Sequence, residues 1–502
     1  MNVVLIVVDS LNRHFLPMYD SGIELDVKTP HIDELAQRGI RFDNHFVGSL
    51  PCMPARREML TGIQEFLWRP WGPIEPFDNP LPRVARDHGY VTQLITDHFH
   101  YFQHGSHGYF TDFQGFEFIR GHEFDAWKTA PIHPDATFLQ QLGADPEQLP
   151  TDFLNRVSYA RNAATFRKEE DFMAPRVFSA AADWMAQNHS HKKFFLMIDC
   201  FDVHEPFHVP QNYAQLYTDE DVRDPHLTIW PSYGQIGAGG RDSLSERKVA
   251  FVRAQYAAKV TLVDTWLGRF FEQMTRYGRW DDTMVVLTTD HGHYLGEHGW
   301  IGKPHCLNYN VLTQIPLIIA HPDIGGGQST SSLTATVDLY ATLREVMGCP
   351  VNGPTHSRSL VSLMDHCRQP GRQWQVYGYF GRDLNITDGR YTFHMSPQPK
   401  RPIYLYSTGF MNPSSWFHPV IVPSEVESGR FLPYTSAPTW RYRVNVSNTF
   451  HAPELYNVYQ DPQQNTNIAA EEPAVSSTMR GLALSALKEL EVPQEVLARF
   501  AY

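Results

Sequence analysis

Runs of consecutive apolar residues recur along the first two thirds of the chain. Val3–Val8 is a continuous aliphatic run, as expected of a strand that helices cover on both faces. Similar runs occur at Val91–Thr96, Phe194–Cys200, Met284–Thr289 and Ile315–Ala320. Patterns with a helical period lie between them, at Ile32–Arg38, Val177–Asn188 and Arg247–Tyr277. This alternation predicts an α/β fold whose large sheet is mixed but mostly parallel and is sandwiched by helices.

The pattern changes after about Asp365. Short strand-like runs separated by turn residues follow at Val376–Phe380, Arg390–Met395 and Tyr404–Tyr406, and a last helical pattern runs over Glu471–Leu490. A chain of 502 residues is also longer than one compact core usually is. We therefore predict a large α/β domain over residues 1–370 and a smaller α+β domain with an antiparallel sheet over residues 371–502.

Carboxylates and imidazoles come directly after four of the predicted strands. They are Asp9, then Asp97 with His98, then Asp202 with His204, and then Asp290 with His291. The carboxyl ends of parallel strands meet at one edge of the sheet, where ligands of α/β proteins bind. One Asp after a strand is commonplace and usually caps the next helix. Because such residues follow four strands that end at one edge of the sheet, we predict a polar site there.

Composition narrows the class of protein. A net charge of −13 argues against a nucleic-acid-binding surface, although an anionic substrate needs only local positive potential. The five Cys residues are too scattered for a disulfide framework or a metal knuckle. No apolar stretch approaches the ~20 residues that span a bilayer, and Val3–Val8 is too short for a signal peptide. We expect a cytoplasmic protein without a membrane partner, or a periplasmic or secreted one if a leader is removed.

The segment from Pro51 to Gly62 joins a Cys to the start of a helix. Pro54 suits the first turn of a helix, which puts Cys52 at the amino end, where unpaired N–H groups favour an anion. Arg56 lies one turn further on, where its side chain can point back toward Cys52. A single Cys is most often a small buried hydrophobe, so the context decides its role.

That context resembles the type I sulfatases, a family of the alkaline phosphatase superfamily. Cys52-x-Pro54-x-Arg56, followed by Leu60-Thr61-Gly62, is similar to the family's signature, in which the Cys is oxidised to formylglycine. The resemblance extends over nearly the whole chain. Its further segments are Thr289-Asp290-His291-Gly292, Gly302-Lys303, His204-Glu205-Pro206-Phe207 and Glu454-Leu455-Tyr456-Asn457.

The resemblance implies one divalent metal ion. Asp9, Asp290 and His291, with oxygens from residue 52, would hold it in a site that suits a hard cation. The family usually uses Ca²⁺, whereas the ring nitrogen of His291 leaves Mn²⁺ or Mg²⁺ open. The ion would orient the hydrated aldehyde and lower the pKa of its attacking hydroxyl.

The resemblance also implies a sulfuric ester hydrolase of the EC 3.1.6 type. One hydroxyl of the hydrated residue 52 would attack sulfur and expel the alcohol, and collapse of the other would release sulfate. Arg56 would hold the diol, while Lys303 and the metal neutralise the ester oxygens. His204 is the candidate acid for the leaving oxygen, with Lys303 as the alternative. Taken alone, Lys303 is equally compatible with a solvated surface charge and His204 with a structural imidazole.

Three positions depart from the sulfatase pattern. Ser10 stands where many sulfatases have a second Asp, and His291 where many have Asn. The family's Lys-Trp-His segment is replaced by Asp97-His98-Phe99-His100-Tyr101. His98 and His100 can either substitute for the missing sulfate contacts or face the leaving group. These departures also resemble the phosphonate monoester hydrolases, a sister group with the same nucleophile and an Asp-His metal pair.

Three functions therefore stay open. We favour a sulfatase because the His98/His100 pair resembles a substitute sulfate-binding element; Trp68 and Trp71 suit a saccharide leaving group. The alternatives are a phosphonate monoester or phosphodiester hydrolase and a non-catalytic binding homologue with unmodified Cys52. The expected partners are a small-molecule or saccharide sulfate ester, a formylglycine-generating maturation enzyme and, in a homo-oligomer, a second copy of the chain.

Overall fold

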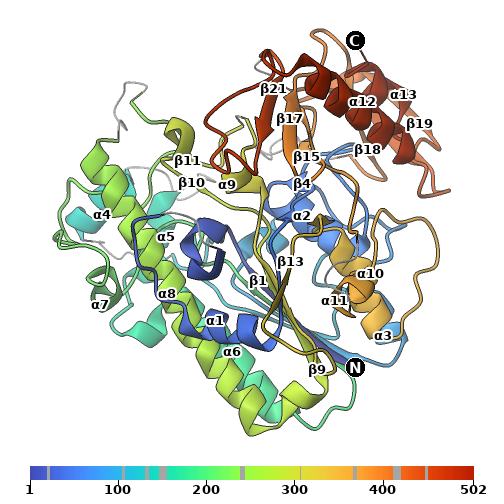
Figure 1. Cartoon of the computed structure of the whole chain (residues 1–502). Helices are drawn as coiled ribbons and strands as arrows, with labels where there is room; N and C mark the ends of the chain where they lie inside the picture. The colour runs from blue at the N-terminus through green and yellow to red at the C-terminus, as the bar shows by residue number, and fades with distance from the viewer. Residues whose placement is uncertain are drawn as a thin grey trace.

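The centre of the fold is a mixed sheet, as expected. The computed structural model describes residues 1–19, 23–103, 108–129, 135–145, 155–237, 244–305, 307–365, 370–410, 420–446 and 450–501. In these residues eight strands form one sheet in the order β13-β2-β12-β9-β1-β7-β5-β6 (Figure 1). The strands are β1 (Asn2–Val8), β2 (Ile40–Phe42), β5 (Val91–Thr96), β6 (Gly115–Phe118), β7 (Phe194–Cys200), β9 (Thr283–Thr288), β12 (Leu317–Ala320) and β13 (Gln328–Thr330).

Most neighbouring strands of this sheet are parallel. β9, β1, β7, β5 and β6 run in one direction, which confirms the predicted architecture. β12, which corresponds to the predicted strand Ile315–Ala320, runs antiparallel to both β9 and β2. The described residues between β9 and β12 form short strands, turns and the four-residue helix Asn310–Thr313 rather than a long crossover helix. Without such a crossover, the chain re-enters the sheet in the opposite direction.

The alternation of side chains along β1 supplies a core on each face of the sheet. Val4, Ile6 and Val8 are buried on one face, which is covered by α1 (Pro30–Arg38), α6 (Met173–Asn188) and α8 (Glu246–Arg276) (Figure 1). Val3, Leu5 and Val7 are buried on the other, under α2 (Cys52–Thr61), α3 (Leu81–Asp87) and α10 (Asp338–Val346). Two covered faces explain why the strand is apolar throughout rather than at every second position.

The C-terminal region carries the predicted antiparallel strands. β15 (Gln375–Tyr379), β16 (Leu384–Thr387), β17 (Tyr391–Met395) and β21 (Glu454–Asn457) pair antiparallel. A fifth strand of this sheet, β4 (Ser49–Leu50), comes from the N-terminal region and pairs parallel with β15. β18 (Ile403–Ser407), β20 (Thr439–Asn445) and β19 (Val420–Gly429) form a second sheet, and α12 (Pro473–Glu489) packs on β16 and β17. The boundary near residue 370 stays a prediction.

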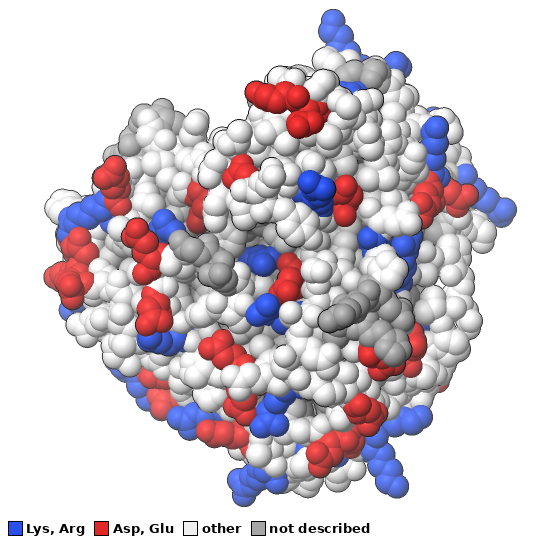
Figure 2. All heavy atoms as spheres, in the orientation of Figure 1, with Lys and Arg blue, Asp and Glu red and all other residues white. Residues whose placement is uncertain are grey.

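The remaining elements are short. The helices are α4 (Ala136–Leu142), α5 (Arg156–Ala163), α7 (Gln211–Ala214), α9 (Asn310–Thr313), α11 (Val361–Asp365) and α13 (Gln494–Ala498). The strands are β3 (His45–Phe46), β8 (Gly234–Gln235), β10 (Tyr294–Leu295), β11 (Trp300–Gly302) and β14 (Thr334–Ala335). Within the described ranges, no helix has the length and apolar character needed to cross a bilayer. Acidic and basic side chains are interspersed over the face shown in Figure 2.

Candidate active site

Four sequence-predicted residues meet beyond the carboxyl ends of β1 and β9. Asp9 follows β1, Asp290 and His291 follow β9, and Cys52 begins α2. One ligand atom from each lies within 4.8 Å of the others, and all four residues are buried. Cys52 Sγ lies 3.2 Å from His291 Nε2. Segments from three distant parts of the chain thus form one compact cluster.

Arg56 holds the carboxylates of this cluster together. Its guanidinium, which is fully buried, donates to Asp290 Oδ2 at 2.6 Å and to Asp9 Oδ2 at 3.0 Å. It also makes two hydrogen bonds of 2.7 Å with Asp199, at the end of β7. Its Nη1 reaches back to the backbone oxygen of Cys52 at 3.2 Å. Arg56 lies one helical turn from Cys52, as the spacing in the sequence requires. The expected contact of Arg56 with a diol on residue 52 stays a prediction.

The cluster has the chemistry of a divalent-cation site. Burial and the neighbouring Asp290 raise the pKa of Asp9 well above its usual value although Arg56 and Lys303 lie nearby, so a further cation beside the two carboxylates would favour their ionised forms. Burial also disfavours ionisation of Asp290, but His291 and Arg56 hold the pKa of that carboxyl far below its usual range. His291 Nδ1 lies 2.8 Å from the backbone oxygen of Gly292, which leaves Nε2 of the neutral ring as a ligand atom. Two carboxylates, an imidazole and residue 52 fit Ca²⁺, Mn²⁺ or Mg²⁺.

Lys303 lies beside the predicted nucleophile. β10 and β11 form an antiparallel hairpin that returns the chain to the site, and Lys303 follows it. Its Nζ lies 3.6 Å from Cys52 Sγ and 3.4 Å from Ser10 Oγ. Burial lowers the pKa of Lys303, but Cys52, Glu205 and the two aspartates outweigh this and raise it overall. Lys303 is therefore a buried cation beside Cys52.

Cys52 itself is a weak nucleophile in this setting. Burial and the charge of Asp9 raise the pKa of its thiol well above the usual value. The thiolate is the reactive form of cysteine, and it is scarce here despite the helix amino terminus. The environment therefore disfavours the thiolate form of Cys52.

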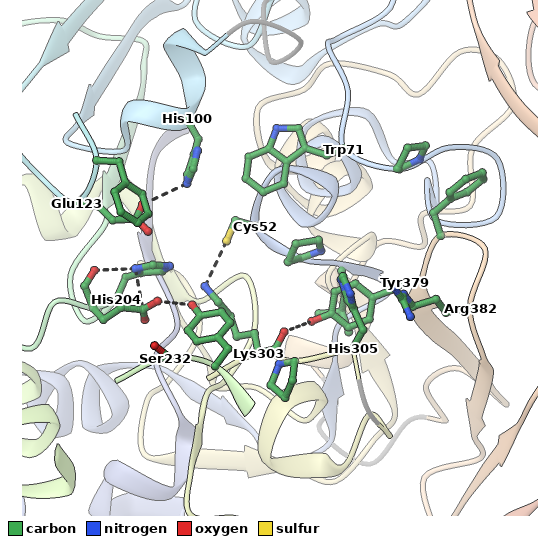
Figure 3. Close-up of a pocket in the computed structure, with 18 of the residues that line it drawn as sticks. Cys52, Trp71, His100, Glu123, His204, Ser232, Lys303, His305, Tyr379 and Arg382 are labelled. Carbon is green, nitrogen blue, oxygen red and sulfur yellow. Dashed lines mark hydrogen bonds and ion pairs between the residues drawn. The ribbon is translucent and has the colours of Figure 1, made fainter. Parts of the chain in front are cut away.

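Cys52 and Lys303 open into a cavity of about 630 Å³. Figure 3 shows Cys52 and Lys303 near its centre, with Glu123 and His204 on one side and Tyr379 and Arg382 on the other. The wall is rich in aromatic rings, namely Trp71, Phe124, Trp230, Tyr233, Tyr379 and Phe380. Both regions of the chain therefore line the cavity. Trp71 lies in it as the sequence suggested, whereas Trp68 is buried and stacks on His356 at 5.4 Å between ring centroids.

The two histidines after β5 lie in different environments. His98 is completely buried, and its Nε2 lies 3.2 Å from Asp9 Oδ2, so it adjoins the carboxylate cluster. His100 lines the cavity and packs edge-on against Trp71 at 4.8 Å. The two ring centroids lie 5.1 Å apart, and the prediction that the pair contacts sulfate or the leaving group remains to be tested.

His204 also lines the cavity. Its Nδ1 lies 2.8 Å from the backbone oxygen of Glu205, and the ring stacks on Phe201. Burial and nearby Lys303 lower the pKa of His204 well below its usual value. The neutral ring then carries its proton on Nδ1 and presents the lone pair of Nε2. To act as the predicted acid, it must first gain a proton, which an anionic ester would favour.

Sequence reasoning missed three groups at this site. Asp199 was hidden inside the apolar run of β7, yet it pairs with Arg56 and accepts a hydrogen bond of 2.5 Å from Tyr101. Glu123 lies in a loop without a motif. Glu205 was part of the His204-Glu205-Pro206-Phe207 segment, and its adjacency to His204 was the signal that could have singled it out.

Comparison with known proteins identifies the family to which this chain belongs. The family model described as Sulfatase matches residues 1–349. The multifunctional alkaline phosphatase superfamily protein PehA of Trinickia caryophylli is 26% identical over 97% of this chain and 94% of its own length. An arylsulfatase of Clostridium perfringens is 23% identical, over 76% of this chain and 82% of its own.

Solved structures show the same fold. The phosphonate monoester hydrolase of Agrobacterium radiobacter aligns with a TM-score of 0.65 at 19% identity, covering 97% of this chain and 96% of its own. A protein solved in complex with its substrate D-glucosamine-2-N,6-O-disulfate aligns with a TM-score of 0.64 at 16% identity, covering 98% of each chain. Since the family model spans well over half of the 502 residues, this chain is a member of the sulfatase family, within the alkaline phosphatase superfamily.

Proposed function

We propose that this protein hydrolyses sulfate monoesters with a formylglycine derived from Cys52 and one divalent cation. The observation that carries the proposal is the convergence of Cys52 with Asp9, Asp290 and His291 within 4.8 Å, at the head of a cavity that Cys52 also lines. The raised pKa of the thiol supports a role for Cys52 as a precursor rather than as a thiolate.

The donor set defines what a cation would do here. Asp9, Asp290, His291 and residue 52 would hold it, and when bound it supplies Lewis-acid stabilisation of the ester oxygens and of a hydroxyl on residue 52. Ca²⁺ is our first choice, with Mn²⁺ or Mg²⁺ as alternatives because one ligand is an imidazole. Arg56 keeps both carboxylates in place, because its fork pairs with each of them.

Two side chains of the cavity act on the ester during hydrolysis. Lys303 offsets negative charge on the non-bridging oxygens, which the distance of 3.6 Å between its Nζ and Cys52 Sγ supports. His204 protonates the leaving oxygen through Nε2, and Lys303 is the alternative donor. The aromatic wall around Trp71 accommodates the leaving group, either a small molecule or a saccharide unit.

A second candidate activity is the hydrolysis of phosphonate monoesters or phosphodiesters. Ser10 Oγ donates to Asp9 Oδ1 at 2.7 Å, where many sulfatases have a further carboxylate. The relatives that cover nearly the whole chain include both a multifunctional superfamily member and, by fold, a phosphonate monoester hydrolase. Both ester classes carry one negative charge, so the charge of Lys303 suits either.

The experiment compares the two ester classes on matured protein. We would produce the chain with a formylglycine-generating enzyme, verify residue 52 by peptide mass spectrometry, and measure kcat/KM for 4-nitrophenyl sulfate and 4-nitrophenyl phenylphosphonate. We expect the sulfate to react faster; a much faster phosphonate would establish the second candidate. An unmodified thiol in protein from the native host would instead support the non-catalytic binding homologue.

Two variants connect the activity to the proposed nucleophile. Cys52→Ala should lower kcat/KM by roughly three orders of magnitude or more, because no other residue replaces the covalent step. Cys349→Ala is the matched control, since Cys349 is a buried free thiol elsewhere in the fold. Equal activity of the two variants would refute the assignment of Cys52.

A further inference from the structure

A second group of acidic and basic side chains lies in the cavity, apart from the predicted metal ligands. Glu123, His204 and Glu205 each place one acceptor atom within 4.8 Å of the other two. All three line the same cavity as Cys52, and each is at most 5% exposed. Figure 3 shows Glu123 and His204 on the same side of the cavity.

Hydrogen bonds within the protein hold this cluster in place, but two of its acceptor atoms have no hydrogen-bond partner. Tyr233 donates its hydroxyl to Glu205 Oε1, and His204 Nδ1 is satisfied by the backbone oxygen of Glu205. Glu205 Oε2 and Glu123 Oε2 have no hydrogen-bond partner although they are buried. A buried carboxylate oxygen without a donor is costly. Burial and the neighbouring Glu205 raise the pKa of Glu123 well above its usual value, and a cation bound beside the two carboxyl groups would favour their ionised forms.

The neighbouring imidazoles make no hydrogen bond to these two oxygens. His204 Nδ1 lies 3.5 Å and His293 Nδ1 lies 3.9 Å from Glu205 Oε2, neither a hydrogen bond. His100 Nε2 lies 3.4 Å from Glu123 Oε2, and its Nδ1 lies 2.5 Å from Gln103 Oε1.

Two buried carboxyl oxygens without hydrogen-bond partners, Glu123 Oε2 and Glu205 Oε2, therefore belong to the same cluster as His204 in the cavity. A protonated primary amine carries one positive charge and three N–H donors, which matches this set. The surrounding wall includes the rings of Trp71, Phe124, Trp230 and Tyr233, and aromatic faces favour organic cations.

We propose that the Glu123–His204–Glu205 cluster binds a protonated amine on the leaving group, so that the substrates are sulfate esters of amino alcohols, aminophenols or amino sugars. The inference rests on the proposed hydrolase function and adds its substrate class. Lys303 would take the anionic end of such a zwitterion and the cluster its cationic end.

The test uses matched ester pairs that differ only in charge. We would compare 2-aminoethyl with propyl sulfate, 3-aminopropyl with butyl sulfate, and 4-(2-aminoethyl)phenyl with 4-propylphenyl sulfate, on formylglycine-bearing enzyme. The amine should be preferred in kcat/KM by about ten- to hundredfold in at least one pair, as for hydrogen bonds to a charged group. Turnover of the neutral esters without preference in any pair overturns this inference alone, whereas failure of all six contradicts the proposed function.

Two isosteric variants locate the preference. Glu123→Gln and Glu205→Gln should each reduce the amine-to-neutral ratio of kcat/KM by about tenfold or more, and the ratio is the readout. Glu117→Gln, an exposed carboxylate on β6, is the matched control and should leave the ratio as in the wild type. An unchanged ratio in both cavity variants overturns the assignment. So does a second equivalent of bound Mn²⁺ or Zn²⁺ per chain that Glu123→Gln abolishes, since the cluster would then be a metal site.

Discussion

Lys303 Nζ lies 3.6 Å from Cys52 Sγ, although 251 positions separate the two residues in the sequence. The β10–β11 hairpin closes this distance by returning the chain to the carboxyl edge of the sheet. The pairing of a buried cation with the predicted nucleophile is the electrostatic centre of the cavity, and it gives the first prediction.

Lys303→Met should lower kcat/KM for 4-nitrophenyl sulfate by roughly a hundredfold, because the developing charge on the ester loses its nearest side-chain cation. Lys303→Arg keeps the charge and should lose less. Initial rates over a range of substrate concentrations separate the effects on kcat and KM. A Lys303→Met enzyme as active as the wild type would show that the ammonium does not contact the reacting group.

Arg56→Met should destabilise the protein by about 3–5 kcal/mol, because three buried carboxylates lose their common partner. A saturating divalent cation should restore part of that loss, since it neutralises Asp9 and Asp290 in the folded state alone. Urea unfolding with and without Ca²⁺ or Mn²⁺ measures both effects.

Arg57→Met is the matched control for this experiment. Arg57 is buried on the same helix but pairs with Asp78 and Glu65, away from the predicted ligands. The Arg57→Met variant should also be less stable than the wild type. A saturating divalent cation should raise its free energy of unfolding by no more than it raises that of the wild type. Equal recovery of the two variants would mean that the cation does not bind between Asp9 and Asp290.

Substitutions of the two histidines after β5 should affect the apparent metal affinity differently. His98→Ala removes the imidazole 3.2 Å from Asp9 and should weaken the apparent metal affinity by about tenfold. His100→Ala acts in the cavity and should raise KM while leaving the metal affinity unchanged. Activity measured against free metal and against substrate distinguishes these outcomes, and the reverse pattern would contradict the placement of the two rings.

Glu58 should make the stability fall with rising pH. Burial raises the pKa of this carboxyl on α2 to about 8, above its value of about 4.5 in the unfolded chain. Its contribution is therefore fully present below pH 4.5 and is lost as the pH rises through about 8. The free energy of unfolding should decline more steeply between pH 5 and 8 in the wild type than in Glu58→Gln. Parallel curves would show that Glu58 is already ionised in the folded protein.

The sequence was sufficient for features that local patterns determine. The buried strands β1, β5 and β7, and the helix that begins at Cys52, were predicted almost to the residue. Apolar runs and the position of Pro54 report on a few neighbouring residues, and that information is contained in the sequence. The convergence of Asp9 and Asp290 was also accessible, because parallel strands share a carboxyl edge.

Features that depend on loops could not be predicted in this way. The direction of β12 follows from the path of residues 289–316 rather than from its own apolar run. His98 and His100 are two positions apart, yet one adjoins Asp9 and the other lines the cavity. Glu123 reaches His204 through the fold alone, with no motif around it to mark its role.

The pairing of β4 with β15 also determines when the segment before Cys52 can fold during synthesis. Ser49 and Leu50, just before Cys52, pair with Gly378 and Tyr379, so this contact cannot form until residue 379 has left the ribosome. At about 5–20 residues per second, that delay is on the order of tens of seconds. Throughout that interval the nascent segment around Cys52 lacks one of its flanking strands. In the finished protein the same thiol is only 3% exposed, so synthesis itself supplies the opportunity to modify it.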